Sequence, residues 1–179
     1  MKASNQFSLG AAVLSVAAMG SLAWFSFGAG QNAVADTTTM DAAVLETPMM
    51  AREVTMHSDP NCGCCGDWAA HLEAHGYQVT TDHSVDVLAL KAEQGIPAMM
   101  RSCHTALIDG YVVEGHVPAE AIEAFLGMAQ KPFGDRTIGI SVPGMPHGSP
   151  GMETGYFNDY DVVAFTADGE AAVIHEVRF

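Results

Sequence analysis

From residue 52 onward, apolar residues recur at strand-like and helix-like intervals. Residues 52–56 predict a short strand that leads into a polar segment and a cluster of cysteines. A helix is predicted over 67–75, because Trp68 and Leu72 share one face and Gly76 stands where a left-handed C-terminal cap belongs.

Five further elements are predicted after this helix, and their order indicates the fold class. They are a strand, a helix, two strands and a helix, at 77–81, 85–94, 105–108, 111–114 and 119–128. Asp109-Gly110 joins the two adjacent strands as a tight hairpin, and Pro118 fits the start of the last helix. The order strand, helix, strand, helix, hairpin, helix predicts a thioredoxin-like α/β domain.

A Pro/Gly-rich loop and a second hairpin are added at the C-terminal end. Residues 141–158 hold three prolines and four glycines, which argues against long regular structure. Residues 160–166 and 171–177 flank Asp168-Gly169 and predict a hairpin. Loops of this length inside a domain are uncommon and often functional, so we expect this one to contribute to a site.

The N-terminal 35 residues have the features of a removable signal peptide. Lys2 precedes the apolar stretch 9–27, and an Ala-Val-Ala cleavage pattern follows at 33–35. An uncleaved membrane anchor is the competing interpretation, because the stretch approaches spanning length. Interspersed glycines and the cleavage pattern favour export. We therefore expect a signal peptide at 1–35, and after it a flexible arm at 36–51 and one domain at 52–179.

The charge of the mature chain excludes two classes of partner. Removing the signal peptide takes away Lys2 and no acidic residue, which leaves six basic and 21 acidic residues and a net charge of −15. Binding to nucleic acid or to an anionic membrane surface requires clustered positive charge. We therefore predict no nucleic-acid partner and, after signal cleavage, no membrane partner.

Four cysteines lie in the mature chain, and three of them fall within four residues. An even number of cysteines in an exported protein first indicates two disulfides. However, Cys62, Cys64 and Cys65 are concentrated at one point, whereas cysteines that stabilise a fold are usually spread along it. The clustering argues against two structural disulfides.

The cysteine cluster precedes a predicted helix, where free N–H groups and the helix dipole stabilise thiolates. Cys62 and Cys65 have C-x-x-C spacing, which serves both disulfide exchange and metal binding. Cys64 favours metal, because a third thiol would interfere with disulfide exchange, whereas adjacent thiolates bridge several Cu(I) ions. A metal cluster is therefore favoured over a redox dithiol or a structural disulfide.

Cys103 and His104 are predicted to form a second wall of the site. In the thioredoxin plan, the turn before the hairpin faces the C-x-x-C loop, often with a cis-proline. Pro97 is an alternative candidate for that cis-proline. The competing interpretation of Cys103 is a buried apolar cysteine in the core.

Other sulfur and imidazole side chains are weaker candidates. The loop offers Met145, His147 and Met152, each of which could ligate copper or, for the methionines, fill a gap in the core. His116 could bind metal, cap the following helix or pair with Glu114. The remaining candidates outside the cluster are His57, His71, His75, Met40, Met49 and Met50.

The combined motifs resemble the periplasmic CopG-type copper-resistance family. The residues that carry this resemblance are Cys62-Gly63-Cys64-Cys65, Trp68-x-x-His71-Leu72, Ser102-Cys103-His104-Thr105, the run Gly110 to Pro118 and the run Val142 to Glu153. The resemblance covers about residues 52–177. Some family members carry a lysine near the position of His57.

The resemblance implies copper handling in the periplasm of a Gram-negative bacterium, with a cysteine-bridged, multinuclear Cu(I) cluster. It implies Cys62, Cys64, Cys65 and Cys103 as thiolate ligands, with His104, His116, Met145 and Met152 nearby. It also implies a role in sequestering, transferring or redox-cycling copper, with a periplasmic copper chaperone or efflux component as partner. Two alternatives stay open at this point: a thiol–disulfide oxidoreductase using Cys62 and Cys65, and a structural Zn²⁺ module.

Overall fold

A computed structural model describes residues 51–179 of the chain. The predicted signal peptide, and the predicted arm up to residue 50, lie outside the described residues. Within the described part, no helix is long and apolar enough to cross a membrane.

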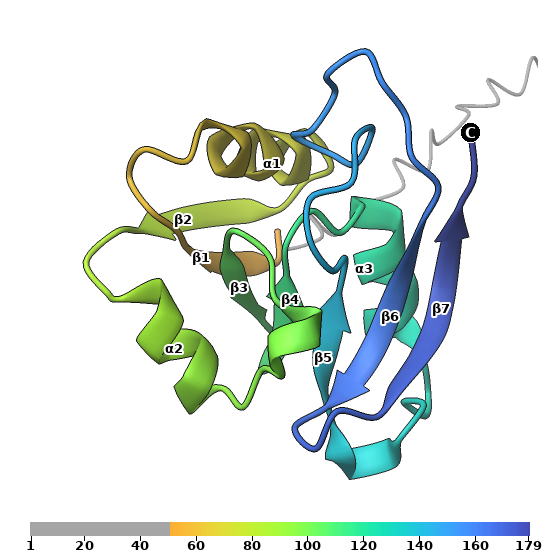
Figure 1. The fold of residues 1–179 in the computed structure, drawn as a ribbon. Coiled ribbons are helices and arrows are strands. Elements are labelled where there is room, and N and C mark those ends of the chain that lie inside the picture. Colours follow the sequence, from red (N-terminus) through yellow and green to blue (C-terminus); the bar gives the residue numbers. More distant parts are fainter. Residues whose placement is uncertain (1–50) are drawn as a thin grey trace, which may run out of the picture. The chain divides into compact units, whose positions relative to one another are not determined.

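One mixed sheet of seven strands organises the described residues, in the order β2-β1-β3-β4-β5-β6-β7 (Figure 1). The strands are β1 Glu53–His57, β2 Gln78–Asp82, β3 Thr105–Ile108, β4 Tyr111–Glu114, β5 Thr137–Ser141, β6 Tyr160–Thr166 and β7 Ala171–Val177. β1 runs parallel to β2 and β4 parallel to β5, and every other neighbouring pair is antiparallel.

Three α-helices and two short 3₁₀ helices complete the fold. They are α1 Gly63–Ala74, α2 Val87–Glu93, α3 Ala119–Gly127, η1 Ala98–Met100 and η2 Gly134–Arg136. Successive side chains of a strand point to opposite faces of a sheet. Accordingly Val113 and Ala164 join the core formed with α1 and α3, whereas Val112 and Phe165 pack with Met100 in a smaller core.

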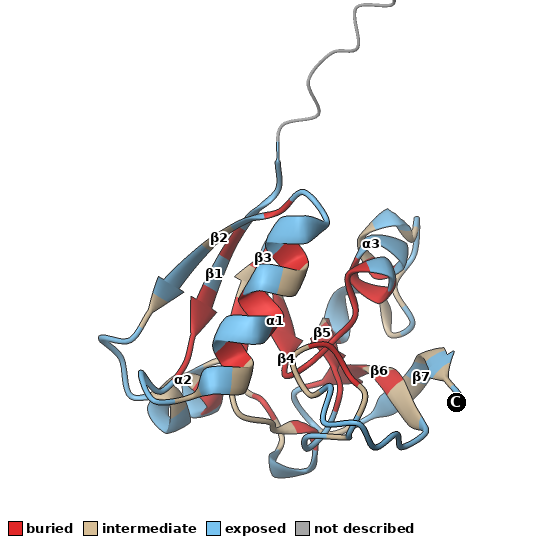
Figure 2. Cartoon of the chain, turned by 90° about the horizontal axis from the view of Figure 1, so that it is seen from above, coloured by how far each residue is buried: buried red, intermediate tan, exposed pale blue. Residues whose placement is uncertain are grey.

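Helix α1 packs an apolar face on the larger core. Trp68 and Leu72 are fully buried, and the Trp68 indole N–H donates to the Val117 carbonyl oxygen at 2.9 Å. Burial of side chains of this size contributes about 1.5–3 kcal/mol each. The outer face of α1 is exposed (Figure 2). This packing fixes the position of the first turn of α1, where the cysteines lie.

Most predicted elements are present, and four strands have the predicted bounds. β3 and β4 are joined by Asp109 and Gly110, which have φ values of 49° and 81°, as a tight hairpin turn requires. α1 begins four residues earlier than predicted, because Cys62 serves as its N-cap and accepts the Gly66 N–H. The cysteines therefore lie within the helix start and not in a preceding loop.

The sequence analysis missed β5, which joins the two predicted hairpins into one sheet. Gly139 breaks its alternating pattern, and the register shifts between Thr137 and Gly139. A Cβ atom on Gly139 would overlap the Val112 carbonyl oxygen and lie 2.7 Å from the carbonyl carbon. β4 and β5 therefore approach each other closely only because this residue is glycine.

We expect Gly139→Ala to lower the free energy of unfolding by about 1–3 kcal/mol, because β4 and β5 must separate to accept the methyl group. Urea denaturation measures the effect. Gly127→Ala is the matched control, because nothing lies within 4 Å of a Cβ at that helical position. The control should leave stability unchanged or raise it by up to about 1 kcal/mol. Equal stabilities of the two variants would contradict the close approach.

Candidate metal centre

Three cysteines stand at the N-terminus of α1, on a helix end that the core holds in place. Cys62 is the N-cap, and Cys64 and Cys65 lie in the first turn. Cys62 and Cys65 form a disulfide, whereas Cys64 and Cys103 are free. The two disulfides that the even count indicated are therefore absent from residues 51–179, but one disulfide with C-x-x-C spacing is present.

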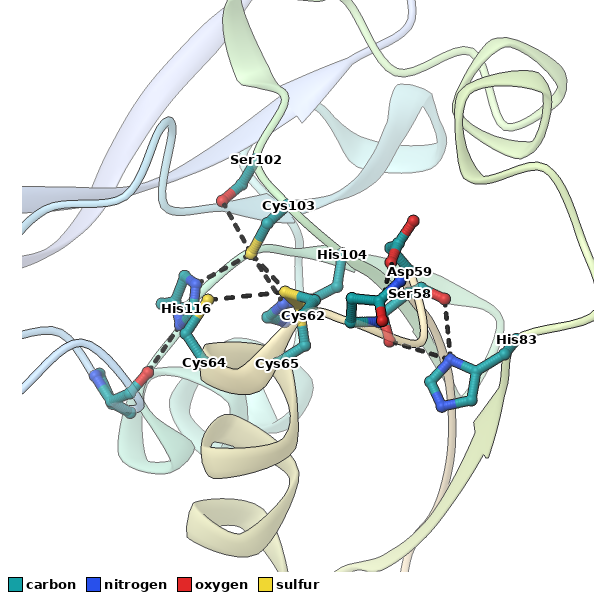
Figure 3. Close-up of a disulfide and its surroundings, with 12 residues drawn as sticks. Ser58, Asp59, Cys62, Cys64, Cys65, His83, Ser102, Cys103, His104 and His116 are labelled. Atoms are coloured by element: carbon teal, nitrogen blue, oxygen red, sulfur yellow. Dashed lines mark hydrogen bonds between the residues drawn. A yellow bond between two sulfur atoms is a disulfide. The ribbon is translucent and has the colours of Figure 1, made fainter.

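Cys103 reaches this helix end from the segment that precedes β3. β1 and β3 are antiparallel with His57 opposite Thr105, so the chain leaving β1 and the chain entering β3 meet at the same edge. Cys103 Sγ lies 3.5 Å from Cys65 Sγ, and Cys64 Sγ lies 3.6 Å from Cys62 Sγ (Figure 3). All four sulfur atoms lie within 4.8 Å of one another. The described chain has no cis peptide bond, so Pro97 is not a cis-proline.

Two histidines extend the sulfur cluster. The His116 imidazole donates from Nδ1 to the Pro150 carbonyl oxygen at 2.8 Å, which leaves Nε2 as an acceptor facing Cys103 Sγ at 3.0 Å. His104 Nδ1 lies 3.4 Å from the same sulfur, and its buried Nε2 has no hydrogen-bond partner of normal geometry. The ligand atoms of Cys103, His104 and His116 lie within 4.8 Å of one another.

Burial keeps these groups uncharged in the metal-free protein. It is the largest cause of the lowered pKa of His104, which falls well below its usual value, and of the lowered pKa of His116. Burial, and next the neighbouring Cys64, raise the pKa of Cys103 to about 11. A neutral imidazole nitrogen is the form that binds metal, but Cys103 must lose its proton first.

The Pro/Gly-rich loop, residues 142–159, covers the start of α1. A Cβ atom on Gly151, which has φ of 81°, would lie 2.5 Å from the Cys64 carbonyl oxygen and 2.8 Å from the Trp68 backbone nitrogen. Only glycine permits this contact. Met152 follows directly and is half-buried, whereas Met145 is 53% exposed. His147 is exposed and its Nδ1 is hydrogen-bonded to the Thr154 hydroxyl, so it belongs to neither ligand cluster.

The other candidate histidines lie elsewhere. His57 Nδ1 is 3.4 Å from an Asp82 carboxylate oxygen. His71 Nε2 accepts the Ala119 N–H at 3.1 Å, and His75 is exposed, so one of the pair packs and the other is solvated. Met40, Met49 and Met50 lie outside the described residues.

The alternatives considered for His116 are not observed. It does not pair with Glu114, whose carboxylate instead binds the Lys91 ammonium in a buried ion pair. Its Nδ1 and Nε2 contact Pro150 and Cys103, and the first N–H of α3, that of Ala119, is accepted by His71 and not by His116. Sequence reasoning missed the Lys91–Glu114 pair altogether, because Lys91 belongs to a seven-residue helix and lysine is rarely buried.

Comparison with known proteins identifies the family. A family model described as "Protein of unknown function, DUF411" matches residues 100–152. A solved structure named copper resistance protein CopG, form 2, is 47% identical, with a TM-score of 0.64, and the match covers 72% of this chain and 99% of that one. The chain belongs to the CopG copper-resistance family. Form 1 of the CopG structure is also 47% identical, with a TM-score of 0.63 and coverage of 70% and 96%. A search of curated proteins found no match.

Acidification below pH 6.5 should destabilise the metal-free protein. Because the pKa values of His104 and His116 are lowered in the folded state, unfolding takes up protons once the pH falls below the unfolded pKa. The free energy of unfolding falls by at most about 1.4 kcal/mol for each histidine at pH 5.5. Urea denaturation at pH 7.5 and 5.5 measures it.

Two variants test the origin of this pH dependence. His104→Gln should reduce the difference in stability between pH 7.5 and 5.5, because it removes a histidine that at pH 5.5 is neutral in the folded protein and protonated in the unfolded chain. His147→Gln, at an exposed position, should leave the difference unchanged. An unaltered difference in the first variant would show that His104 is not the source.

Proposed function

We propose that this chain is a periplasmic copper-resistance protein that holds Cu(I) in a multinuclear cluster bridged by cysteine thiolates. The proposal rests on the four Sγ atoms that lie within 4.8 Å of one another beside two neutral imidazoles. Thiolate and imidazole are soft or borderline ligands, and thiolates select Cu(I) among biological metals. Membership of the CopG family supports copper as the metal.

The geometry supports the cysteines, His104 and His116 of the proposed ligand set, and the family motifs and the sequence of the Pro/Gly-rich loop add Met145, His147 and Met152. Cys103 connects the two groups of ligand atoms, because it belongs to the sulfur cluster and also contacts both histidines. His116 has the arrangement typical of a metal-binding histidine, in which the second ring nitrogen donates to a carbonyl oxygen. The assigned thiolates are Cys62, Cys64, Cys65 and Cys103, with His104, His116, Met145, His147 and Met152 as further candidates.

The frame of the site supports a thioredoxin-like assignment for residues 52–128. The order β2-β1-β3-β4 has β1 and β2 parallel and β3 antiparallel to both of its neighbours. α1 and α3 share a core on one face of this sheet. β5, the Pro/Gly-rich loop and the β6–β7 hairpin are additions to that frame.

The Cys62–Cys65 disulfide must open before all four sulfurs can bind copper. In that step a dithiol reductant becomes a disulfide, and its two hydrogens pass to Cys62 and Cys65 as new thiol groups. Each thiol then releases its proton as Cu(I) binds. The predicted signal peptide supports a role in sequestering, transferring or redox-cycling copper in the periplasm, with a copper chaperone or efflux component as the proposed partner.

Anaerobic titration of the reduced protein with Cu(I) should give more than one copper per chain. Thiolate-to-copper charge-transfer absorbance should rise in step with the copper content, because bridging thiolates bind each ion. Metal analysis after desalting gives the stoichiometry. The protein with its disulfide intact is the control and should bind less copper. Absence of copper uptake would refute the proposal.

Cys64→Ser should lower the copper stoichiometry and the charge-transfer absorbance, because a bridging thiolate is replaced by a hydroxyl of low affinity for Cu(I). The disulfide between Cys62 and Cys65 should still form, since Cys64 takes no part in it. Alkylation followed by mass spectrometry checks that disulfide. Copper binding equal to that of the unaltered protein would exclude Cys64 as a bridging ligand.

A thiol–disulfide oxidoreductase is the second candidate function. The Cys62–Cys65 disulfide at a helix N-terminus supports it, as does Cys103, whose sulfur lies 3.5 Å from Cys65 Sγ. However, burial raises the pKa of Cys103 to about 11, so at pH 7 this residue is almost entirely a neutral thiol. Such a thiol attacks a disulfide slowly. Insulin reduction without copper uptake would favour this function over the first.

A further inference from the structure

A buried pair of opposite charges lies behind residues 102–104, which we call the Cys103 segment. Lys91, on α2, is 2% exposed, and Glu114, at the end of β4, is fully buried. The ammonium contacts one carboxylate oxygen, Oε1, and also donates to the Thr105 hydroxyl at 2.8 Å. Thr105 in turn donates to the other oxygen, Oε2, at 2.6 Å. Three elements, α2, β3 and β4, therefore meet at one carboxylate.

The same carboxylate holds the backbone next to Cys103. Oε1 of Glu114 accepts the N–H of Ser102 at 2.7 Å. Ser102 precedes Cys103, and the next residue, His104, accepts the Gly115 N–H at 3.1 Å through its carbonyl oxygen. The residues on both sides of Cys103 are thus bonded to the end of β4, Ser102 through its N–H and His104 through its carbonyl oxygen.

Stability alone does not explain a buried ion pair. Replacing such a pair by apolar residues of similar volume is often neutral or stabilising, because both charges lose their hydration on burial. An apolar pair could not, however, accept the Ser102 N–H. Two groups therefore require an oxygen acceptor at this position, the Thr105 hydroxyl on Oε2 and the backbone N–H of Ser102 on Oε1.

Packing does not fix this segment on every side. Lys91, Ser102 and Cys103 line an open cavity of about 540 Å³, whose other wall comes from α2 and the chain after β1. On the opposite side, the Ser102 hydroxyl donates to the Gly144 carbonyl oxygen of the Pro/Gly-rich loop. The hydrogen bond from the Ser102 N–H to Glu114 opposes movement of the segment into the cavity, as do the hydrogen bonds that join Arg101 and Ser102 to Gly144.

We propose that Glu114, with its charge compensated by Lys91, is a positioning residue that fixes Cys103 against the first turn of α1. This inference rests on the proposed copper function, because Cys103 is the sulfur that joins the two groups of ligand atoms. Glu114 itself touches no copper ligand side chain. Its contribution is to fix the Arg101–Ser102 peptide unit, which leads directly into Cys103.

Two double variants separate the hydrogen bond from the charge. Lys91→Met with Glu114→Gln, the Met/Gln variant, removes both charges but keeps an amide oxygen that accepts the Ser102 N–H. Lys91→Met with Glu114→Met, the Met/Met variant, has the same net charge and a similar volume, but it has no acceptor. The two proteins differ only in that acceptor and in the amide group that carries it.

The first readout is independent of copper. The copper-free protein with its disulfide intact is treated with an alkylating reagent. Peptide mass spectrometry then measures the alkylation rates of Cys103 and Cys64 in the same sample. Cys103 should react about tenfold faster in the Met/Met variant than in the Met/Gln variant, because the segment gains freedom to move. Cys64, on the helix, should differ less than twofold. Equal Cys103 rates would overturn the proposal.

The second readout is the copper site. After reduction and loading with Cu(I), the Met/Gln variant should keep the charge-transfer spectrum and stoichiometry of the unaltered protein, and the Met/Met variant should lose absorbance and copper. Identical spectra in both variants would overturn the positioning role. If the unaltered protein bound no copper, the proposed function would fail, whereas the alkylation rates would still decide whether Glu114 positions Cys103.

Amide hydrogen exchange keeps the test decisive if the Met/Met variant does not fold. The Ser102 N–H of the unaltered protein should exchange at least about a hundredfold more slowly than an unprotected amide, because it is bonded to a buried carboxylate. The Met/Gln variant should retain most of this protection. Exchange at the rate of an exposed loop amide would overturn the proposal.

Discussion

The pairing of β1 with β3 is the constraint on which the candidate site depends. Because His57 lies opposite Thr105, the chain that leaves β1 and the chain that enters β3 meet at one edge of the sheet. Cys62 lies five positions after His57, and Cys103 lies two positions before Thr105. A register shift of one residue would turn the Cys103 side chain toward the other face. The register therefore determines whether four sulfurs can meet.

Two opposing electrostatic effects act where these sulfurs meet. The N-terminus of α1 presents a partial positive charge to the sulfurs of Cys62, Cys64 and Cys65, whereas burial disfavours charge on Cys103. For Cys103 burial prevails, since its pKa rises to about 11. The metal-free site is therefore neutral on the side of Cys103, His104 and His116. A cation that binds there displaces a proton from Cys103, so its affinity increases with pH.

Local patterns in the sequence were sufficient to predict most of the fold. The Asp109-Gly110 turn and the alternating flanks gave β3 and β4 their bounds, because a two-residue turn fixes its own register. β5 escaped prediction, because Gly139 is required by the neighbouring Val112 backbone, which is a tertiary contact. The early start of α1 escaped too. Gly63 and Gly66 are poor helix formers in isolation, and the helix gains its stability from the burial of Trp68.

Part of the candidate site was also predictable from local patterns in the sequence. The close spacing of Cys62, Cys64 and Cys65 is visible in the sequence, and the fold order indicated where Cys103 would lie. Long-range contacts to side chains without a motif were not visible. The hydrogen bond from His116 to Pro150 depends on the path of the Pro/Gly-rich loop, and the Lys91–Glu114 pair depends on how α2 packs. Neither contact has a fixed spacing along the chain.

A closed disulfide and a four-sulfur copper cluster exclude each other, because both use the sulfurs of Cys62 and Cys65. Cys64 and Cys103 remain thiols when the disulfide is closed. In an oxidising compartment the disulfide is favoured unless a reductant or a tightly bound metal shifts the balance. Copper that binds the opened pair stabilises the reduced form by mass action. The site thus offers two free sulfurs in one redox state and four in the other, and under the proposed function the binding of copper would favour the second.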